Sequence, residues 1–222
     1  MGSVKRQARI LLLLAIGAWL SWGTMAWSFA SCRERDPLLL RQVLAAMGRP
    51  EVVVEEVALF DGDQCLVQLV LDRRGLRGSL PPEIGQFHHL RALSLSYNQL
   101  SGPIPAELGQ LRELEQLFLD YNQFSGPVPP ELGQLRNLEN LYLSDNRLSG
   151  PIPPELAQLK QLRDLRLARN QLTGKLPSFL AELPRLERLH IGGNPGLCLP
   201  AALSSWFAGL NEGDPAPTFP CP

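Results

Sequence analysis

An asparagine recurs at one constant interval along this chain, and the residues around it recur with it. Its five copies are Asn98, Asn122, Asn146, Asn170 and Asn194. A fixed period of this length predicts a solenoid, in which each unit stacks on its neighbours because no unit can bury its apolar face alone. The function is then expected on a surface that several repeats build together, and not in one enclosed pocket.

The unit Leu90 to Glu113 shows how one copy is expected to fold. Leu93 and Leu95 alternate with small or polar residues, which predicts a short strand with one buried face. Gly102 allows a backbone conformation that other residues resist, and Pro105 fixes the bend that follows. Each unit therefore consists of a strand, a turn and a return segment.

The recurring asparagine is expected to be structural. Its side-chain amide offers donors and an acceptor, so stacked copies can satisfy backbone groups at the turns. The segment from Glu107 to Leu111 predicts a loose helical return on the convex side. The leucine phase extends back to Leu66 and forward to Ile191, which predicts six strands.

The first thirty residues follow a different pattern. A basic start is followed by an uncharged apolar stretch over residues 10–30, and Ser28-Phe29-Ala30 offers small residues for cleavage. These features predict a secretory signal peptide over residues 1–30. An uncleaved anchor helix is one alternative, because about 20 apolar residues span a bilayer. Acylation of Cys32 is another, because Phe29-Ala30-Ser31-Cys32 is similar to a bacterial lipobox.

The chain has four cysteines, namely Cys32, Cys65, Cys198 and Cys221. In an exported protein an even number suggests disulfides. The first two precede or open the repeats and the last two close them, so a solenoid keeps the two pairs far apart. We therefore expect Cys32–Cys65 and Cys198–Cys221 bridges, whereas acylation of Cys32 would leave Cys65 unpaired.

Residues 66–198 resemble the plant-type class of leucine-rich repeats, LxxLxxLxLxxNxLxGxIPxxLGx, and the match is most specific over residues 114–159. The resemblance implies an α/β solenoid, a right-handed horseshoe with a parallel concave sheet and capped ends. Asp36 and Pro37 are similar to the N-cap and first turn of the N-terminal capping helix of that class. The stretch from Ala201 to Leu210 is expected to cover the open core of the last unit.

The expected organisation has four parts. These are a signal peptide (1–30), an N-terminal cap (31–65), leucine-rich repeats that follow the asparagine period (66–197) and a C-terminal disulfide cap (198–222). The family includes ectodomains of plant receptor-like kinases and their co-receptors, secreted polygalacturonase-inhibiting proteins, and bacterial secreted proteins. By resemblance, the chain is an extracellular module, secreted or at the cell surface, that recognises a protein or peptide through its concave face. Alternatives are an inhibitor of a secreted hydrolase and a ligand-binding, ectodomain-like component of a signalling or cell-surface system.

Outward positions of the strands and the turns that follow them carry residues that the leucine scaffold does not dictate. The candidate binding residues are Tyr97, Phe118, Tyr121, Tyr142, Asp145, Arg166, Arg169 and His190. Tyrosine and arginine are frequent anchors of interfaces, so we expect one exposed aromatic patch beside the two arginines. A carbohydrate is an alternative ligand, because aromatic rings also stack on sugars. A solvated sheet with incidental aromatics is the alternative without a ligand.

Other classes of function find little support in the sequence. The 21 basic and 22 acidic residues nearly balance, which argues against nucleic acid as a partner. No metal-ligand spacing, phosphate loop or paired-carboxylate signature occurs, so we expect no catalytic residue, metal or cofactor. Asp164 and His190 lie in adjacent units, and we expect them to form a surface contact only. We expect the protein to be a monomer.

Overall fold

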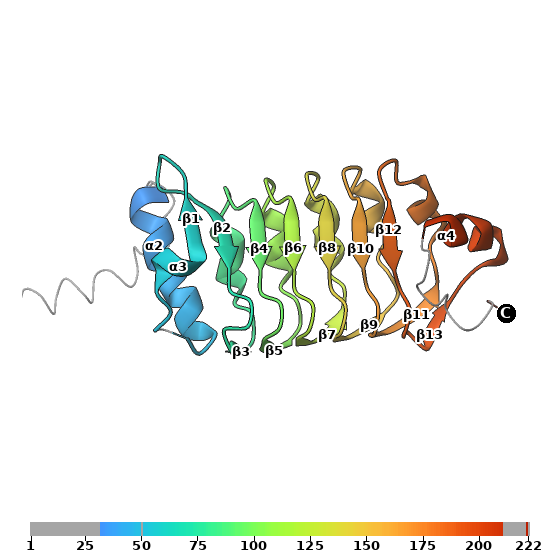
Figure 1. Ribbon diagram of the computed structural model, residues 1–222, viewed down its shortest axis with the longest axis horizontal. Coiled ribbons are helices and arrows are strands. Elements are labelled where there is room, and N and C mark those ends of the chain that lie inside the picture. The colour runs from blue at the N-terminus through green and yellow to red at the C-terminus, as the bar shows by residue number, and fades with distance from the viewer. Residues whose placement is uncertain (1–31, 50, 211–220, 222) are drawn as a thin grey trace, which may run out of the picture.

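The computed structural model describes residues 32–49, 51–210 and 221, which form an elongated solenoid (Figure 1). Its main sheet has seven strands in the order β1-β2-β4-β6-β8-β10-β12. They are β1 (Ala58–Phe60), β2 (Leu66–Val70), β4 (Ala92–Ser94), β6 (Gln116–Phe118), β8 (Asn140–Tyr142), β10 (Asp164–Arg166) and β12 (Arg188–His190). The six strands predicted from the repeats are present and parallel. The seventh, β1, was not predicted and adds an antiparallel edge beside β2.

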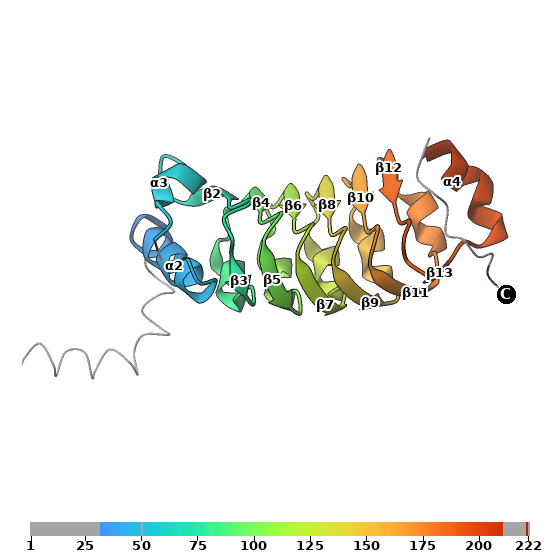
Figure 2. The same ribbon diagram turned by 60° about the horizontal axis from the view of Figure 1, so that its bottom comes forward.

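A second sheet, which the sequence did not predict, runs beside the main one and comes forward in Figure 2. Its order is β13-β11-β9-β7-β5-β3. The strands are β3 (Arg77–Gly78), β5 (Gln99–Gly102), β7 (Gln123–Pro127), β9 (Arg147–Gly150), β11 (Gln171–Lys175) and β13 (Gly196–Cys198). Gly102 has a φ of 80°, which confirms the expected left-handed turn.

The return segments on the convex side are 3-10 helices, as the sequence predicted in outline. They are η1 (Pro82–Gln86), η2 (Ala106–Gln110), η3 (Pro130–Gln134), η4 (Pro154–Gln158) and η5 (Ser178–Glu182). A proline in extended conformation precedes each of them, such as Pro105 before η2. Proline suits this position because its fixed φ starts the turn and its missing N–H is not needed there.

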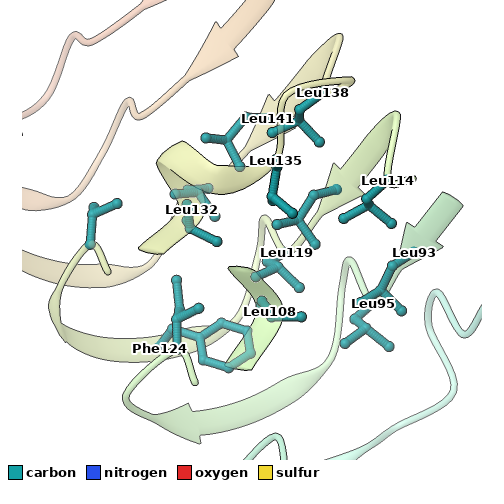
Figure 3. Packing of buried hydrophobic residues seen from close by; sticks show 14 of the residues in the cluster. Leu93, Leu95, Leu108, Leu114, Leu119, Phe124, Leu132, Leu135, Leu138 and Leu141 are labelled. Atoms are coloured by element: carbon teal, nitrogen blue, oxygen red, sulfur yellow. The ribbon is translucent and has the colours of Figure 1, made fainter. Parts of the chain in front are cut away.

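Leucines from every unit fill the space between the main sheet and the 3-10 helices. Figure 3 shows leucines of neighbouring units packed on one another, with Phe124 among them. Leu93, Leu117 and Leu141 lie at matching register positions of adjacent strands and are fully buried. Burial of each such side chain contributes about 1.5–3 kcal/mol, so the continuous core is the main stabilising feature of the solenoid.

The asparagines form a ladder inside the turns, as expected. The Asn122 amide donates to the carbonyls of Leu95 and Leu119 at 2.9 and 3.2 Å, and its oxygen accepts the Leu100 N–H at 3.0 Å. Asn98, Asn146, Asn170 and Asn194 repeat this pattern. Each side chain thus joins its own turn to the preceding unit, which confirms its structural role.

The N-terminal cap contains α2 (Cys32–Ala46) and α3 (Val54–Val57). The prediction that Asp36 caps the N-terminus of the helix is wrong, because α2 begins at Cys32. The fully buried Asp36 carboxylate instead accepts the Leu66 N–H at 2.8 Å and pairs with Arg35 at 2.9 Å. Asp36 therefore fastens the helix to the start of β2. Pro37 lies within the helix, beyond its first turn.

The C-terminal cap contains η6 (Ala201–Leu203) and α4 (Ser204–Leu210), which closes the end of the solenoid in Figure 1. Phe207 is buried and Trp206 packs partly against the core, so the expected cover over the last unit is confirmed. Both expected disulfides are present, Cys32–Cys65 and Cys198–Cys221. The predicted signal peptide lies outside the described residues, and the four domain boundaries stay predictions.

Candidate ligand-binding face

The concave face is the side of the main sheet turned away from the leucine core, together with the turns that follow its strands. One row of side chains on it, which we call the turn ladder, consists of Arg73, Tyr97, Tyr121, Asp145 and Arg169. Successive members occupy the same position in successive repeats, and from Tyr97 onward each directly precedes a ladder asparagine. Four of these residues were predicted for the site from the sequence, and Arg73 was not.

Every member of the turn ladder has a left-handed backbone, with φ between 53° and 59°. This conformation is unfavourable for large side chains and suits glycine or asparagine. At the equivalent position of the last unit the chain has Gly193, with a φ of 72°. The backbone thus accepts glycine here, so the large side chains are not needed to build the turn.

The turn ladder is held together by contacts between neighbouring side chains. The rings of Tyr97 and Tyr121 stack with centroids 4.3 Å apart and planes 9° from parallel. The guanidinium of Arg73 lies 4.5 Å from the centre of the Tyr97 ring, on which it stacks. At the other end Arg169 Nε pairs with Asp145 Oδ1 at 2.7 Å, and Arg169 Nη2 lies 3.4 Å from the Tyr121 hydroxyl. The nearby charge of Asp145 raises the pKa of Tyr121.

A second group, the strand cluster, consists of Phe118, Tyr142, Asp164, Arg166 and Arg188. Asp164 Oδ2 accepts the Tyr142 hydroxyl at 2.9 Å, Arg166 Nη2 at 2.9 Å and Arg188 Nε at 2.8 Å. The Arg166 guanidinium lies 4.0 Å from the centre of the Tyr142 ring, and Phe118 packs against Tyr142 with centroids 4.5 Å apart. The cluster is therefore a preformed network around one carboxylate.

Asp164 and His190 were expected to form a surface contact, whereas the structure buries the Asp164 side of that pair, with 0% of the residue exposed. Burial by itself would raise the pKa of Asp164, but the hydrogen bonds from Arg166, Tyr142 and Arg188 lower it overall. The Tyr142 hydroxyl, half-buried and donating to Asp164, has a raised pKa. A usable signal for this network was present in the sequence, since Asp164 and Arg188 lie at the same strand position of adjacent units.

The predicted single aromatic patch is in fact two separate pairs. Tyr97 and Tyr121 are 44% and 37% exposed and stack in the turn ladder, whereas Phe118 and Tyr142 are half-buried in the strand cluster. The four rings form two pairs because each ring packs against the ring at the equivalent position of an adjacent unit. The aromatic surface open to a partner is therefore mainly that of Tyr97 and Tyr121.

A groove of about 410 Å³ opens beside the C-terminal end of the turn ladder. Five of the eight residues predicted for the site line it, namely Tyr121, Asp145, Arg166, Arg169 and His190. Tyr97 stacks behind Tyr121, while Phe118 and Tyr142 lie in the strand cluster. The structure thus brings most of the predicted residues to one place.

Sequence reasoning missed the feature that makes the groove, which is a row of shrinking side chains. At the position two residues before the ladder asparagines, the chain has Asp120, Ser144, Ala168 and Gly192, and all four line the groove. The decrease in size opens space toward the C-terminal end of the face. Burial raises the pKa of Asp120, whose Oδ1 accepts the Ser96 hydroxyl at 2.6 Å. Comparing this position from one repeat to the next would have revealed the taper.

A single trio of possible metal ligands occurs among the described residues, formed by Cys32, Cys65 and His89. Both sulfurs are joined in a disulfide, so neither is a thiolate that could bind a metal ion. The concave face offers carboxylates, but each one discussed above already accepts a hydrogen bond from a neighbouring side chain. Its chemistry suits recognition by stacking, ion pairing and hydrogen bonding.

A protein-family model described as a leucine-rich repeat region matches residues 66–210. The chain belongs to the leucine-rich repeat family. The comparison with curated protein sequences finds no significant match. Together with the solved structures below, the family match indicates a binding module of the kind found in receptor ectodomains, with no catalytic family indicated.

Several solved structures from Arabidopsis thaliana are similar. The leucine-rich repeat ectodomain of the receptor kinase SOBIR1 is 30% identical with a TM-score of 0.67, and the alignment covers 75% of this chain and 96% of that one. The BIR2 ectodomain is 35% identical with a TM-score of 0.59 over 64% of this chain and 74% of that one. The receptor kinase GASSHO1/SCHENGEN3, solved with CASPARIAN STRIP INTEGRITY FACTOR 2, is 34% identical with a TM-score of 0.68 over 73% of this chain and 21% of that one.

The disulfides at both ends and the similarity to ectodomains indicate an extracellular protein, since disulfides persist in oxidising compartments. Within residues 32–49 and 51–210, no helix is long and apolar enough to cross a bilayer.

Proposed function

We propose that this protein is an extracellular module that recognises a protein or peptide through its concave face, with the turn ladder and the adjoining groove as the main contact surface. The observation that carries the proposal is the left-handed backbone under the five ladder residues. Large side chains at such positions are unfavourable and are kept at ligand-binding sites when they have a use there. Gly193 at the equivalent position supports the view that folding alone does not require them.

The orientation of the aromatic rings supports a protein or peptide over a sugar. Tyr97 and Tyr121 stack on each other between adjacent units, so each ring covers one face of the other. Arg73 covers a further face, that of Tyr97. One face of Tyr121 is the ring face left without a stacking partner in this pair, and the rest of the exposed aromatic surface consists of edges and hydroxyls. Edges and hydroxyls suit the mixed apolar and polar contacts of a polypeptide.

The similar structures support the same class of partner. GASSHO1/SCHENGEN3 was solved with CASPARIAN STRIP INTEGRITY FACTOR 2, RGFR1 is named a plant peptide hormone receptor in complex with RGF2, and BIR3 was solved with SERK2. These proteins bind peptides or other ectodomains. The present chain shares their fold, and we infer that it also binds a peptide or another protein.

Affinity purification from extracellular extracts tests the proposal with three baits. One bait is the unchanged protein, the second carries Tyr121→Ala and Tyr142→Ala, and the third carries Arg112→Ala and Arg136→Ala. The two arginines of the third bait are exposed on the convex side, where their guanidinium groups donate to neighbouring glutamines. A partner captured by the first and third baits and lost by the second is the expected result. Equal capture by all three contradicts the proposal.

The identity of a captured partner then narrows the role. A small secreted peptide or a receptor ectodomain matches the proposal directly, and a hydrolase whose activity falls on binding assigns the inhibitor role.

We also propose that the exported chain is cleaved near Ala30, with Cys32 bonded to Cys65 and carrying no lipid. Intact-mass measurement of the native protein decides this, because acylation of Cys32 adds mass and leaves a free thiol at Cys65.

A further inference from the structure

The turn ladder is interrupted at Asp145. Tyr97 has Arg73 on one ring face and Tyr121 on the other. Among the described residues only Tyr97 stacks on Tyr121, so the opposite face of the Tyr121 ring has no stacking partner, and Tyr121 lines the groove. The next residue of the ladder is the short Asp145, so the stack stops where the groove begins. The groove therefore presents one open aromatic face with a carboxylate beside it.

Asp145 has one oxygen with a partner and one without. Oδ1 accepts Arg169 Nε at 2.7 Å, whereas Oδ2 is buried and has no hydrogen-bond partner among the described residues. A buried acceptor without a donor is unfavourable by about 1–3 kcal/mol. The Arg169 side chain that pairs with Asp145 is 65% exposed, so packing does not fix it and it can adjust to a ligand while it keeps its bond to Oδ1. The site thus lacks a hydrogen-bond donor at a defined atom.

A planar group that carries several N–H donors satisfies both features, because it can stack on the Tyr121 ring and donate to Asp145 Oδ2. The guanidinium of arginine is such a group, with five N–H donors in one plane. Lysine is cationic but has no plane to stack, and phenylalanine is planar but has no donor. Arginine is therefore the side chain that fits best.

The concave face already contains both kinds of contact that this arrangement needs, an arginine stacked on a tyrosine ring and a carboxylate shared by two arginines. Arg73 stacks on Tyr97 and Arg166 stacks on Tyr142, with guanidinium carbons 4.5 and 4.0 Å from the ring centres. Two arginines also share one carboxylate, since Arg166 and Arg188 both donate to Asp164 Oδ2. A second guanidinium on Asp145 Oδ2, beside Arg169 on Oδ1, would likewise let two arginines share one carboxylate.

The charges at the Tyr121 end of the groove also suit a cation. The two carboxylates of Asp120 and Asp145 line this end, and Arg169 is the cation paired with Asp145. Asp164 pairs with both Arg166 and Arg188. Asp120 has no ion pair among the described residues, so its carboxylate is the one open to a guanidinium that enters at this end.

We propose that the groove binds an arginine side chain of the partner, which stacks on Tyr121 and donates hydrogen bonds to Asp145 Oδ2, with Asp120 as the second carboxylate. This inference rests on the proposed function and names the chemistry of the residue that the partner inserts. It requires a free or flexible arginine on the ligand, in an extended peptide or on an exposed loop.

The tyrosines give a direct readout, because the chain has three and all of them lie on the concave face. We would label the protein with ring-13C tyrosine and titrate it with N-acetyl-arginine amide, using N-acetyl-lysine amide as the matched probe. Tyr121→Phe assigns the Tyr121 signal. The arginine probe is expected to shift the Tyr121 ring signal in a saturable way, with a dissociation constant of about 1–20 mM, and to bind about tenfold more tightly than the lysine probe.

Asp145→Asn removes the carboxylate and keeps the fold, because asparagine is well tolerated in a left-handed conformation. It is expected to weaken binding of the arginine probe about tenfold. Asp63→Asn, which removes an exposed carboxylate in the N-terminal cap, is the control with the same charge change and should have no effect. Equal binding of the two probes, no saturable shift, or full binding by Asp145→Asn each overturns the inference.

The outcome separates this inference from the function on which it rests. If the Tyr121→Ala and Tyr142→Ala bait loses its partner but the arginine probe does not bind, the concave face binds a partner through other groups and the inference is overturned. If the probe binds but all three baits capture the same proteins, the groove accepts arginine while the proposed function fails.

Discussion

Two ladders run side by side along this solenoid, one residue apart in the sequence. The asparagine ladder is the same residue in five successive units, from Asn98 to Asn194, points inward and bonds to backbone groups of its own and the preceding unit. The turn ladder changes from Arg to Tyr, Tyr, Asp and Arg, points outward and is held by contacts between side chains. A position that has the same residue in successive repeats builds the turn. The neighbouring position, where the residue varies, is available for recognition.

The largest expected effect comes from substituting residues of the two ladders at adjacent positions. Asn122→Ala leaves the Leu100 N–H without its acceptor and removes one of the two side-chain amide donors from each of the Leu95 and Leu119 carbonyls, which is expected to lower the free energy of unfolding by about 2–4 kcal/mol. Tyr121→Ala removes an exposed ring and is expected to lower it by less than about 1.5 kcal/mol. Urea unfolding of both variants measures the difference. Similar losses for the two would remove the distinction between the ladders.

A smaller effect is expected from the strand cluster, where one carboxylate is as buried as the asparagines. Asp164→Asn weakens three charge-assisted contacts and is expected to reduce stability by about 1–3 kcal/mol at pH 7. The folded-state pKa of Asp164 lies below its ordinary value, so its ionised form stabilises the fold above the unfolded-state pKa of about 3.9. That contribution is lost as the pH falls from about 4 through the lowered value.

The measurement is the free energy of unfolding of both proteins between neutral and strongly acidic pH. The gap between wild type and Asp164→Asn should close as the pH falls through the folded-state pKa of Asp164. A gap that stays constant over this range would show that the carboxylate charge is not what stabilises the cluster.

The smallest expected effect is the coupling between neighbouring rungs of the turn ladder. A double-mutant cycle with Tyr97→Ala and Tyr121→Ala should give a coupling energy of about 0.5–1.5 kcal/mol, because the rings stack directly. The pair Tyr97→Ala and Asp145→Ala, two units apart, is the control and should be additive. Additive effects in the first pair would mean that stacking of the two rings contributes nothing to stability.

Sequence reasoning predicted the parts of the fold that depend on period. The buried Leu93 and Leu117, the turn at Gly102, the asparagine ladder and both disulfides follow from spacing and chain order alone. The antiparallel strand β1 and the buried role of Asp36 could not be predicted in this way. Both lie before the first repeat and have no second copy to reveal them.

The candidate site was predicted in composition more than in arrangement. Tyr121, Asp145, Arg166, Arg169 and His190 were all identified as outward residues, and they line one groove. Their division into a stack and a network could not be deduced, because it depends on rotamers that let each side chain contact the next unit. The burial of Asp164 has the same cause, since three neighbouring side chains close over it.

Residue-specific chemical labelling in the presence of a captured partner tests the concave face most directly. All three tyrosines lie on that face, whereas Lys160 and Lys175, the lysines among the described residues, lie on other sides of the solenoid. We expect the partner to slow nitration of Tyr97 and Tyr121 and to leave acetylation of both lysines unchanged, as read by mass spectrometry. Unchanged nitration together with protected lysines would place the partner elsewhere and contradict the account.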